Sequence, residues 1–227
     1  MTRRVCAVVV AAGSGSRLGA DIPKALVEVS GRALVWHAVS GLVAAGVERV
    51  AVSVPHGYLE AFSSVLAGLP VVLTHGGAER QESVRCGLAA LDEPGEAIVL
   101  VHDAARPRVS PQVVDRVVRA VEDGADAVIP AIPVADSIRA VTADGSAVVD
   151  RSVLRAVQTP QGFRYARLLR AHEAVARAGE RVTDDAAAVE LDGGVVRLVE
   201  GDPQMMKVTQ PFDLDCVRAA LAEGKTR

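Results

Sequence analysis

Apolar and polar positions along the chain alternate in blocks, and the period within a block switches between that of a strand and that of a helix. Short, mostly continuous apolar runs predict buried strands over Val5–Val10, Arg49–Val54, Val71–Leu73, Ala97–Val101, Ala127–Ile132 and Val195–Val199. Apolar residues at helical spacing predict helices over Ala33–Ala45, Leu59–Leu66, Gln81–Leu91, Pro111–Val121, Arg164–Ala178, Asp184–Leu191 and Phe212–Ala222. Continuous apolar strands interleaved with helices are typical of a parallel sheet that is covered on both faces.

One segment departs from this order. After Pro133, Ser137–Val141 and Ala147–Asp150 alternate apolar with polar residues around a turn at Asp144-Gly145, which predicts a hairpin of half-exposed strands. A hairpin inserted into such a protein tends to project, and a projecting two-stranded arm needs a partner surface for its apolar residues. We therefore expect an α/β fold, a Rossmann-like, mostly parallel twisted sheet with helices on both faces and a projecting β-hairpin arm at about residues 134–157.

Length and composition narrow the possibilities. The 227 residues contain no repeat or linker, so we expect one domain over residues 1–227. Aromatic residues make up 3% and the net charge is −3, which argues against nucleic acid as a partner. No apolar run approaches the ~20 residues of a membrane span, so no membrane partner is expected. The apolar run after Thr2-Arg3-Arg4 imitates a signal peptide, but its shortness favours a first strand.

The cysteines bear on the compartment. Cys6, Cys86 and Cys216 lie far apart and form no CxxC pair. Such usage is typical of small buried thiols in a reducing environment, and it predicts a cytoplasmic protein.

The loop after the first predicted strand combines small residues with cations. Its backbone amides would be exposed, and Arg17 and Lys24 stand close by, which favours a polyphosphate site. A dinucleotide fingerprint does not fit, because Leu18 occupies the position of the third glycine after Gly13 and Gly15. A P-loop does not fit either, because Lys24 follows a proline instead of a glycine. A plain glycine turn would leave the two cations unexplained.

Asp103 is the candidate metal ligand. It follows a strand that carries no charge, so it is expected at the carboxyl end of the sheet, where ligands bind in open parallel sheets. A carboxylate there can meet Mg²⁺ and the phosphates that the ion bridges. The alternative is a helix N-cap or loop anchor, although the next helix signal starts only at Ser110-Pro111. His102 is interpreted as a packing or hydrogen-bonding residue, because no second His or Cys stands at metal-ligand spacing.

Several of these loops together resemble a known family. The first-strand loop with Pro23-Lys24, the run Gly76-Gly77-x-x-Arg80-Gln81-x-Ser83-Val84, and Val101-His102-Asp103-Ala104-Ala105-Arg106-Pro107 are similar to those of 2-C-methyl-D-erythritol 4-phosphate cytidylyltransferases. Further similar segments are Asp150-Arg151, Gln158-Thr159-Pro160-Gln161, Thr183-Asp184-Asp185-Ala186 and Lys207-Val208-Thr209. The resemblance runs in order from about Val5 to Leu214, whereas the first loop alone would indicate only the wider nucleotidyltransferase superfamily.

The resemblance implies an enzyme that joins CMP from CTP to methylerythritol phosphate and releases pyrophosphate, in the non-mevalonate route to isoprenoids. It implies Mg²⁺ or another divalent cation, and a homodimer formed through the arm. By motif, the nucleotide would be bound by Ala11, Ala12, Gly13, Gly15, Gly77, Ser83 and Asp103, with Asp103 also holding the metal. The catalytic cations would be Arg17, Lys24, Arg151 and Lys207. The acceptor would be met by Arg106, Ser137, Arg151, Thr159 and Thr183.

Three positions depart from the family pattern. Arg155 stands where tryptophan is common, Met205 replaces a frequent asparagine, and Ser137 keeps the hydroxyl of a frequent threonine.

Two alternatives stay open beside the main hypothesis. A ribitol-5-phosphate cytidylyltransferase would share the CTP loops and differ in the acceptor pocket. A non-catalytic nucleotide-binding module would not need the metal carboxylate at Asp103.

Overall fold

The computed structural model describes residues 4–13 and 22–223, and an eight-stranded sheet forms its centre. The strands are β1 (Val5–Val10), β4 (Arg49–Val54), β5 (Val71–His75), β6 (Ile98–Asp103), β7 (Ala127–Pro133), β10 (Arg155–Val157), β11 (Gln161–Arg164) and β12 (Val196–Glu200). Their order is β10-β7-β11-β6-β1-β4-β5, and β12 also pairs with β7. Only β10 and β11 pair antiparallel with their neighbours, so the predicted mostly parallel sheet is confirmed.

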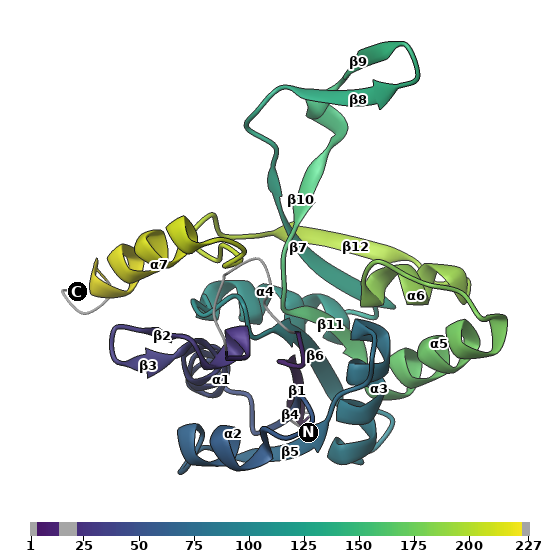
Figure 1. Ribbon diagram of the computed structural model, residues 1–227. Coiled ribbons are helices and arrows are strands. Elements are labelled where there is room, and N and C mark those ends of the chain that lie inside the picture. Colours follow the sequence, from purple (N-terminus) through teal and green to yellow (C-terminus); the bar gives the residue numbers. More distant parts are fainter. Residues whose placement is uncertain (1–3, 14–21, 224–227) are drawn as a thin grey trace.

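Helices cover both faces of this sheet (Figure 1). They are α1 (Leu34–Ala44), α2 (Leu59–Val65), α3 (Arg80–Leu91), α4 (Pro111–Glu122), α5 (Tyr165–Ala178), α6 (Asp185–Leu191) and α7 (Pro211–Glu223). Because side chains alternate along a strand, Ala7 and Val9 of β1 pack with α1 and α4, and Cys6 and Val8 pack with α3 and α5. Among the described residues, no helix combines the length and apolar character needed to cross a membrane.

Short elements follow β1 and bring the segment around Lys24 to the carboxyl end of the sheet. A 3-10 helix, η2 (Lys24–Leu26), precedes a small ribbon of β2 (Glu28–Val29) and β3 (Arg32–Ala33). The predicted helix from Ala33 therefore starts one residue late, because Ala33 pairs with Glu28 in this ribbon. Val29 packs with Val208 and with Val217 of α7 in a separate apolar cluster. This packing places the segment around Lys24 next to the segment around Lys207.

Strands β10 and β11 were not predicted. Both lie against β7, and residues 158–160 separate them. Arg164, which was predicted to start a helix, instead ends β11 and precedes α5. The polar Gln161 at the start of β11 conceals this strand in the apolar pattern, although the residue itself is buried.

The hairpin arm stands clear of the body (Figure 1). It consists of β8 (Ile138–Thr142), β9 (Gly145–Val149) and the short helix η3 (Arg151–Val153), and it leaves the sheet after β7 and returns at β10. Val141 is 90% exposed and Val148 is 73% exposed, so apolar side chains of the arm face solvent in the single chain. The arm is therefore the part of the fold that lacks a packing partner within the described residues.

Candidate functional site

A pocket of about 350 Å³ lies at the carboxyl end of the parallel strands. Its lining comes from the end of β1, the turn between β5 and α3, the end of β6, η2 and the loop between β12 and α7. The residues are Val10, Ala11, Ala12, Gly13, Lys24, Ala25, Gly77, Ala78, Glu79, Arg80, Ser83, Asp103, Ala104, Ala105 and Lys207. This position is the usual ligand site of an open parallel sheet.

The turn between β5 and α3 forms one wall of the pocket and has no room for side chains at its glycines. A Cβ on Gly76 would lie 2.5 Å from the Cβ of Ala12, so glycine lets this turn approach the loop after β1. The backbone N–H groups of this turn are not available to an anion, because they already donate hydrogen bonds within the protein. Gly77 N donates to the Ser83 hydroxyl at 3.2 Å, and the N–H groups of Ala78 and Glu79 donate to the Glu82 carboxylate at 2.8 and 3.3 Å. An anion is therefore expected to bind elsewhere in the pocket.

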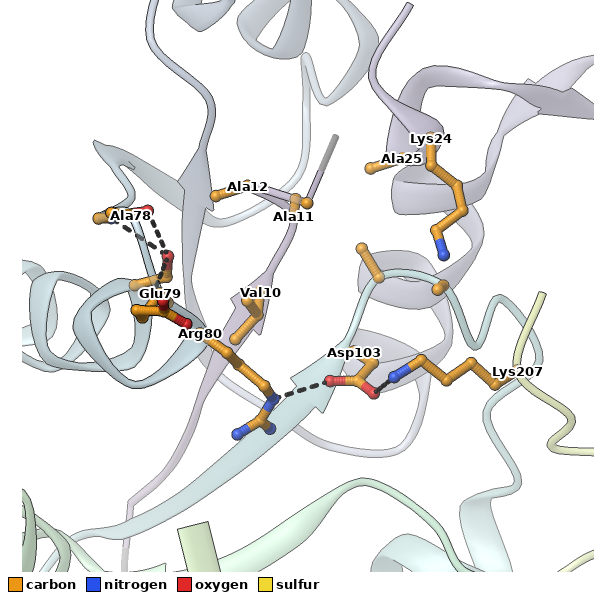
Figure 2. Close-up of a pocket in the computed structure, with 15 residues that line it drawn as sticks. Val10, Ala11, Ala12, Lys24, Ala25, Ala78, Glu79, Arg80, Asp103 and Lys207 are labelled. Atoms are coloured by element: carbon orange, nitrogen blue, oxygen red, sulfur yellow. Dashed lines mark hydrogen bonds and ion pairs between the residues drawn. The ribbon is translucent and has the colours of Figure 1, made fainter. Parts of the chain in front are cut away.

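Asp103 sits between two cations at the centre of the site. Figure 2 shows Arg80 and Lys207 reaching it from opposite sides, with Arg80 Nε 3.3 Å from Oδ1 and Lys207 Nζ 2.7 Å from Oδ2. The residue is only 9% exposed, and such burial raises a carboxyl pKa. The charges of Arg80, Lys207 and Arg106 nevertheless hold the pKa of Asp103 well below its ordinary value. Asp103 is thus an ionised carboxylate at neutral pH.

A buried chain of hydrogen bonds supports Asp103 from behind. Its backbone N–H donates to the Thr159 hydroxyl at 3.1 Å, and that hydroxyl lies 3.0 Å from Nδ1 of His102. Nε2 of His102 donates to the carbonyl of Arg106 at 2.9 Å, which assigns the ring proton to Nε2 because a carbonyl can only accept. Burial lowers the pKa of His102 to about 4, so the ring is neutral at neutral pH. His102 is a hydrogen-bonding residue, as predicted.

Arg80 connects Asp103 to a second buried carboxylate. Its Nη1 lies 2.8 Å from Oδ2 of Asp185, and Oδ1 of Asp185 lies 3.0 Å from Nε2 of His172. Burial would raise the pKa of Asp185, but the charge of Arg80 and the hydrogen bond from His172 lower it. Burial alone would lower the pKa of Arg80, and the two carboxylates raise it. The site therefore contains a charge series of Lys207, Asp103, Arg80 and Asp185, and His172 hydrogen-bonds to its last member.

The two lysines of the pocket come from distant parts of the chain and lie beside the same loop. Lys24 Nζ donates to the carbonyl of Val208 at 3.1 Å, and Val208 N donates to Ala105 O at 2.8 Å. Arg106 Nη1 donates at 2.8 Å to the carbonyl of Met205, which precedes Lys207 in the chain as Val208 follows it. The backbone that carries Lys207 is thus tied to the end of β6 and, through its carbonyl, to Lys24.

Comparison with known proteins gives the family of the chain. The model of the family described as IspD, 2-C-methyl-D-erythritol 4-phosphate cytidylyltransferase, matches residues 5–223. The chain belongs to this family. A cytidylyltransferase of that name from Saccharopolyspora erythraea is 49% identical over 225 residues, covering 96% of this chain and 99% of the relative. Another from Rhodococcus jostii is 46% identical over 223 residues, covering 97% and 96%.

Solved structures of the cytidylyltransferase family share the fold as well. The crystal structure of 2-C-methyl-D-erythritol 4-phosphate cytidylyltransferase from Thermus thermophilus is similar with a TM-score of 0.82 at 37% identity, covering 96% of this chain and 98% of that one. A 4-diphosphocytidyl-2C-methyl-D-erythritol synthase is similar with a TM-score of 0.81 at 30% identity, covering 97% and 100%. The similarity therefore extends over nearly the whole chain.

The structure brings together one part of the predicted cytidylyltransferase site. Ala11, Ala12, Gly13, Lys24, Gly77, Ser83, Asp103 and Lys207 all line the pocket. Gly15 and Arg17 lie outside the described residues. Around Asp103, the described chain holds no group of three or more His, Cys, Asp or Glu side chains placed to bind a metal ion. A metal at Asp103 would therefore need most of its ligands from substrate or water.

The residues predicted to meet the acceptor are not part of this pocket lining. Ser137 and Arg151 lie exposed on the arm, where the Arg151 guanidinium donates to the carbonyl of Ala135. Thr183 is exposed just before α6. Thr159 is buried behind Asp103, and Arg106 donates to the carbonyls of Met205 and Val157 at the root of the arm. Their contact with an acceptor stays a prediction.

Sequence reasoning gave no role to Arg80 and Asp185, which belong to the charge series, or to His172, which hydrogen-bonds to Asp185. Arg80 carried a signal that could have been used, because it opens a helix at the same sheet edge as Asp103. His172 carried none, since its partner lies 13 residues away across a helix end. Met205, which stands where the family often has asparagine, has its side chain fully buried in the apolar core.

Proposed function

We propose that this protein transfers CMP from CTP to 2-C-methyl-D-erythritol 4-phosphate, yielding 4-diphosphocytidyl-2-C-methyl-D-erythritol and pyrophosphate. Membership in the cytidylyltransferase family over residues 5–223 supports this activity. The observation that carries it is the ionised Asp103, held between Arg80 and Lys207 at the edge of the parallel strands. A pocket that combines a carboxylate with cations suits a metal-bound polyphosphate.

The two walls of the pocket favour one orientation of CTP. The turn at Gly77 and Ser83 has its amides paired and carries the Glu82 carboxylate, so it suits the uncharged cytosine and ribose. The triphosphate would lie toward the loop of Ala11, Ala12 and Gly13, where Lys24 and Lys207 supply positive charge. Gly15 and Arg17 would extend this phosphate-binding loop, as the family motif implies.

Mg²⁺ or another divalent cation would be held at Asp103. A hard oxygen ligand that stays ionised suits Mg²⁺, which is commonly bound by one or two carboxylates together with substrate phosphates. The lack of further metal-ligating side chains around Asp103 among the described residues agrees with such a shared site. When bound, the ion would neutralise phosphate charge during transfer.

The chemistry requires positioning more than proton transfer. The acceptor phosphate is already anionic near neutral pH, so its oxygen can form the new bond to the α-phosphorus while the bond to the leaving pyrophosphate breaks. Two anions must approach, and charge grows on the leaving group. Lys24, Arg17, Lys207 and Arg151 would hold the anions and stabilise that charge. No general base or nucleophilic side chain is needed.

The acceptor half of the site would be completed by a second chain. The arm carries Ser137 and Arg151 away from the body and exposes Val141 and Val148. A two-stranded hairpin is marginally stable alone, so its apolar side chains are best buried in a homodimer. In such a dimer, Ser137 and Arg151 of the arm would join Arg106, Thr159 and Thr183 around methylerythritol phosphate.

The enzyme would act in the cytoplasm. Cys6, Cys86 and Cys216 are all free thiols, which fits a reducing compartment. Its place would be the non-mevalonate route to isoprenoid precursors, as the family implies.

One assay tests the activity. Pyrophosphate release is measured with CTP and Mg²⁺, and with either methylerythritol phosphate or ribitol 5-phosphate as acceptor. We expect turnover with methylerythritol phosphate and little with ribitol phosphate. The reverse preference would favour the ribitol-5-phosphate alternative, and CTP binding without turnover on either acceptor would indicate a non-catalytic module.

A further inference from the structure

The two cations on Asp103 are held in different ways. The Arg80 side chain is 29% exposed and bridges two carboxylates, with Nε on Asp103 and Nη1 on Asp185. The Lys207 side chain is 42% exposed and places its ammonium 2.7 Å from the other oxygen of Asp103. Arg80 is therefore clamped from two sides, whereas Lys207 reaches the site from a loop at the surface.

Asp185 is a rigid support for Arg80. It lies in the first turn of α6, and its backbone N–H donates to Oε1 of Gln161 at 3.2 Å. Gln161 also donates to Asp184, whose carboxylate caps the helix by accepting from Ala187 N. His172 of α5 holds Oδ1 of the Asp185 carboxylate, and Gln161 of β11 holds the backbone of the same residue.

This difference decides which cation can leave Asp103. If Arg80 moved away, Asp185 would lose its counter-charge while its side chain is only 1% exposed. A buried carboxylate without a partner is strongly unfavourable. If Lys207 moves away, its ammonium passes to solvent or to phosphate oxygens at the mouth of the pocket, and both are good partners. Lys207 is therefore the exchangeable cation.

We propose that Arg80, anchored on Asp185, is a positioning residue that keeps the Asp103 carboxylate in place while a divalent cation exchanges with Lys207. This inference rests on the proposed function, which gives Asp103 its metal. Asp185 acts only through Arg80, and Lys207 is released toward the phosphates. Arg80 thus fixes the metal-binding carboxylate, whereas Lys207 moves to the phosphates of the substrate.

The test is a titration of Mn²⁺ followed by the EPR signal of the free ion, with CTP and the acceptor both omitted, so that Lys207 has no phosphate to hold and no free nucleotide binds the ion. We expect Arg80→Met and Asp185→Asn to weaken Mn²⁺ binding by about tenfold or more, as loss of a group that orients a metal ligand does. Lys207→Met removes the competing cation and should tighten Mn²⁺ binding. Arg80→Lys keeps the charge but not the two-armed guanidinium, so binding should fall between wild type and Arg80→Met.

The opposite changes in Mn²⁺ affinity that are expected for Arg80→Met and Lys207→Met distinguish a positioning role of Arg80 from a purely electrostatic one. If Arg80 acted only as a positive charge, Arg80→Met would tighten Mn²⁺ binding as Lys207→Met does, and Arg80→Lys would match wild type. Either result would overturn the proposal. The Arg80 variants still decide the question if Asp185→Asn fails to fold, which thermal melts would show.

A matched control lies at the other end of α6. Asp192 also accepts from arginine side chains, including Arg170 Nε at 2.8 Å, but it lines no part of the pocket. Asp192→Asn should leave Mn²⁺ binding unchanged, and an equal loss there would overturn the proposal by showing a general effect of α6. Failure to turn over methylerythritol phosphate would contradict the proposed function, while the order of Mn²⁺ affinities would still test the role of Arg80.

Discussion

The pocket and the arm are built in opposite ways, although both lie at the same edge of the sheet. In the pocket, Asp103 is 9% exposed and the charges around it have partners drawn from different elements. In the arm, Val141 is 90% exposed and the two strands of the hairpin bond mainly to each other. The pocket is organised within one chain, so its geometry exists before any ligand binds. The hairpin of the arm, by contrast, forms a small sheet of its own and leaves Val141 and Val148 exposed in the single chain.

On the proposed function this contrast divides the reaction between the two regions. The nucleotide meets a site that is formed within the single chain, and the acceptor meets a site that forms on association. Changes in the pocket should therefore affect the chemical step, and changes in the arm should affect acceptor use alone.

The largest effect is expected for Lys24→Ala. Lys24 is placed to hold phosphate charge in the pocket, and loss of one positioned charge donor lowers kcat by about 10²–10³, or ~3–4 kcal/mol. Arg17→Ala should have a similar effect through the same phosphates. Pyrophosphate release at saturating substrates measures both. Arg119→Ala, an exposed arginine paired with Asp115, is the control, and near-normal turnover of Lys24→Ala would remove Lys24 from the catalytic cations.

The buried support of Asp103 should show itself in the pH dependence of stability. The pKa of His102 is lowered by burial from 6.5 to about 4, so between these values the unfolded chain binds a proton that the folded chain does not. The stabilisation is complete above pH 6.5 and is lost as the pH falls toward 4, by about 3 kcal/mol in total.

His102→Gln should flatten this part of the profile. Urea unfolding at several pH values, without metal or nucleotide, measures the slope in both proteins. Equal slopes for wild type and His102→Gln would show that another group carries the dependence. The arm, which the structure describes throughout, contains no buried titratable residue, so a deletion in the arm should leave the slope unchanged.

Deletion of residues 137–151 tests the arm directly. We expect monomers in analytical ultracentrifugation and a loss of about 10² in turnover with methylerythritol phosphate, because part of the acceptor site would be missing or misplaced. CTP affinity should be retained, since the pocket lies within one chain. Persistent dimers would contradict association through the arm, and a parallel loss of CTP binding would contradict the division into two regions.

The smallest effect is expected for Arg151→Ala. Arg151 is assigned to the acceptor phosphate, and loss of one charged hydrogen bond should raise the KM for methylerythritol phosphate by about tenfold. The KM for CTP should stay unchanged. Arg155→Ala is a matched control, because Arg155 is also exposed and donates to the nearby carbonyls of Ser152 and Leu154. Unchanged kinetics in Arg151→Ala would remove Arg151 from the acceptor site.

The elements that apolar patterning predicted well are those buried on both faces. Val5–Val10 and Arg49–Val54 have the predicted bounds, because central parallel strands read as uninterrupted apolar runs. Asp103 was found for the same reason, since the first charge after such a run marks the end of the strand. Strand β11 escaped because its first residue, Gln161, is polar and buried by hydrogen bonds to α6.

The charge series was harder to predict than the strands. Arg80 and Asp185 stand in distant parts of the chain, and their contact depends on how α6 packs against the sheet, which spacing in the chain does not reveal. Thr159 stood in a family motif, but the buried direction of its hydroxyl toward His102 follows only from the path between β10 and β11. Local patterns predict elements, whereas contacts between distant elements require the tertiary fold.

Arg106 connects the pocket and the arm through its hydrogen bonds. It lies after β6, yet its guanidinium holds the carbonyl of Val157 at the root of the arm and that of Met205 in the loop of Lys207. Swinging the arm relative to that loop would break a charged hydrogen bond, at a cost of ~1.5–3 kcal/mol. The position of the arm root relative to the Lys207 loop thus depends on Arg106, a residue that the family motif assigns to the acceptor.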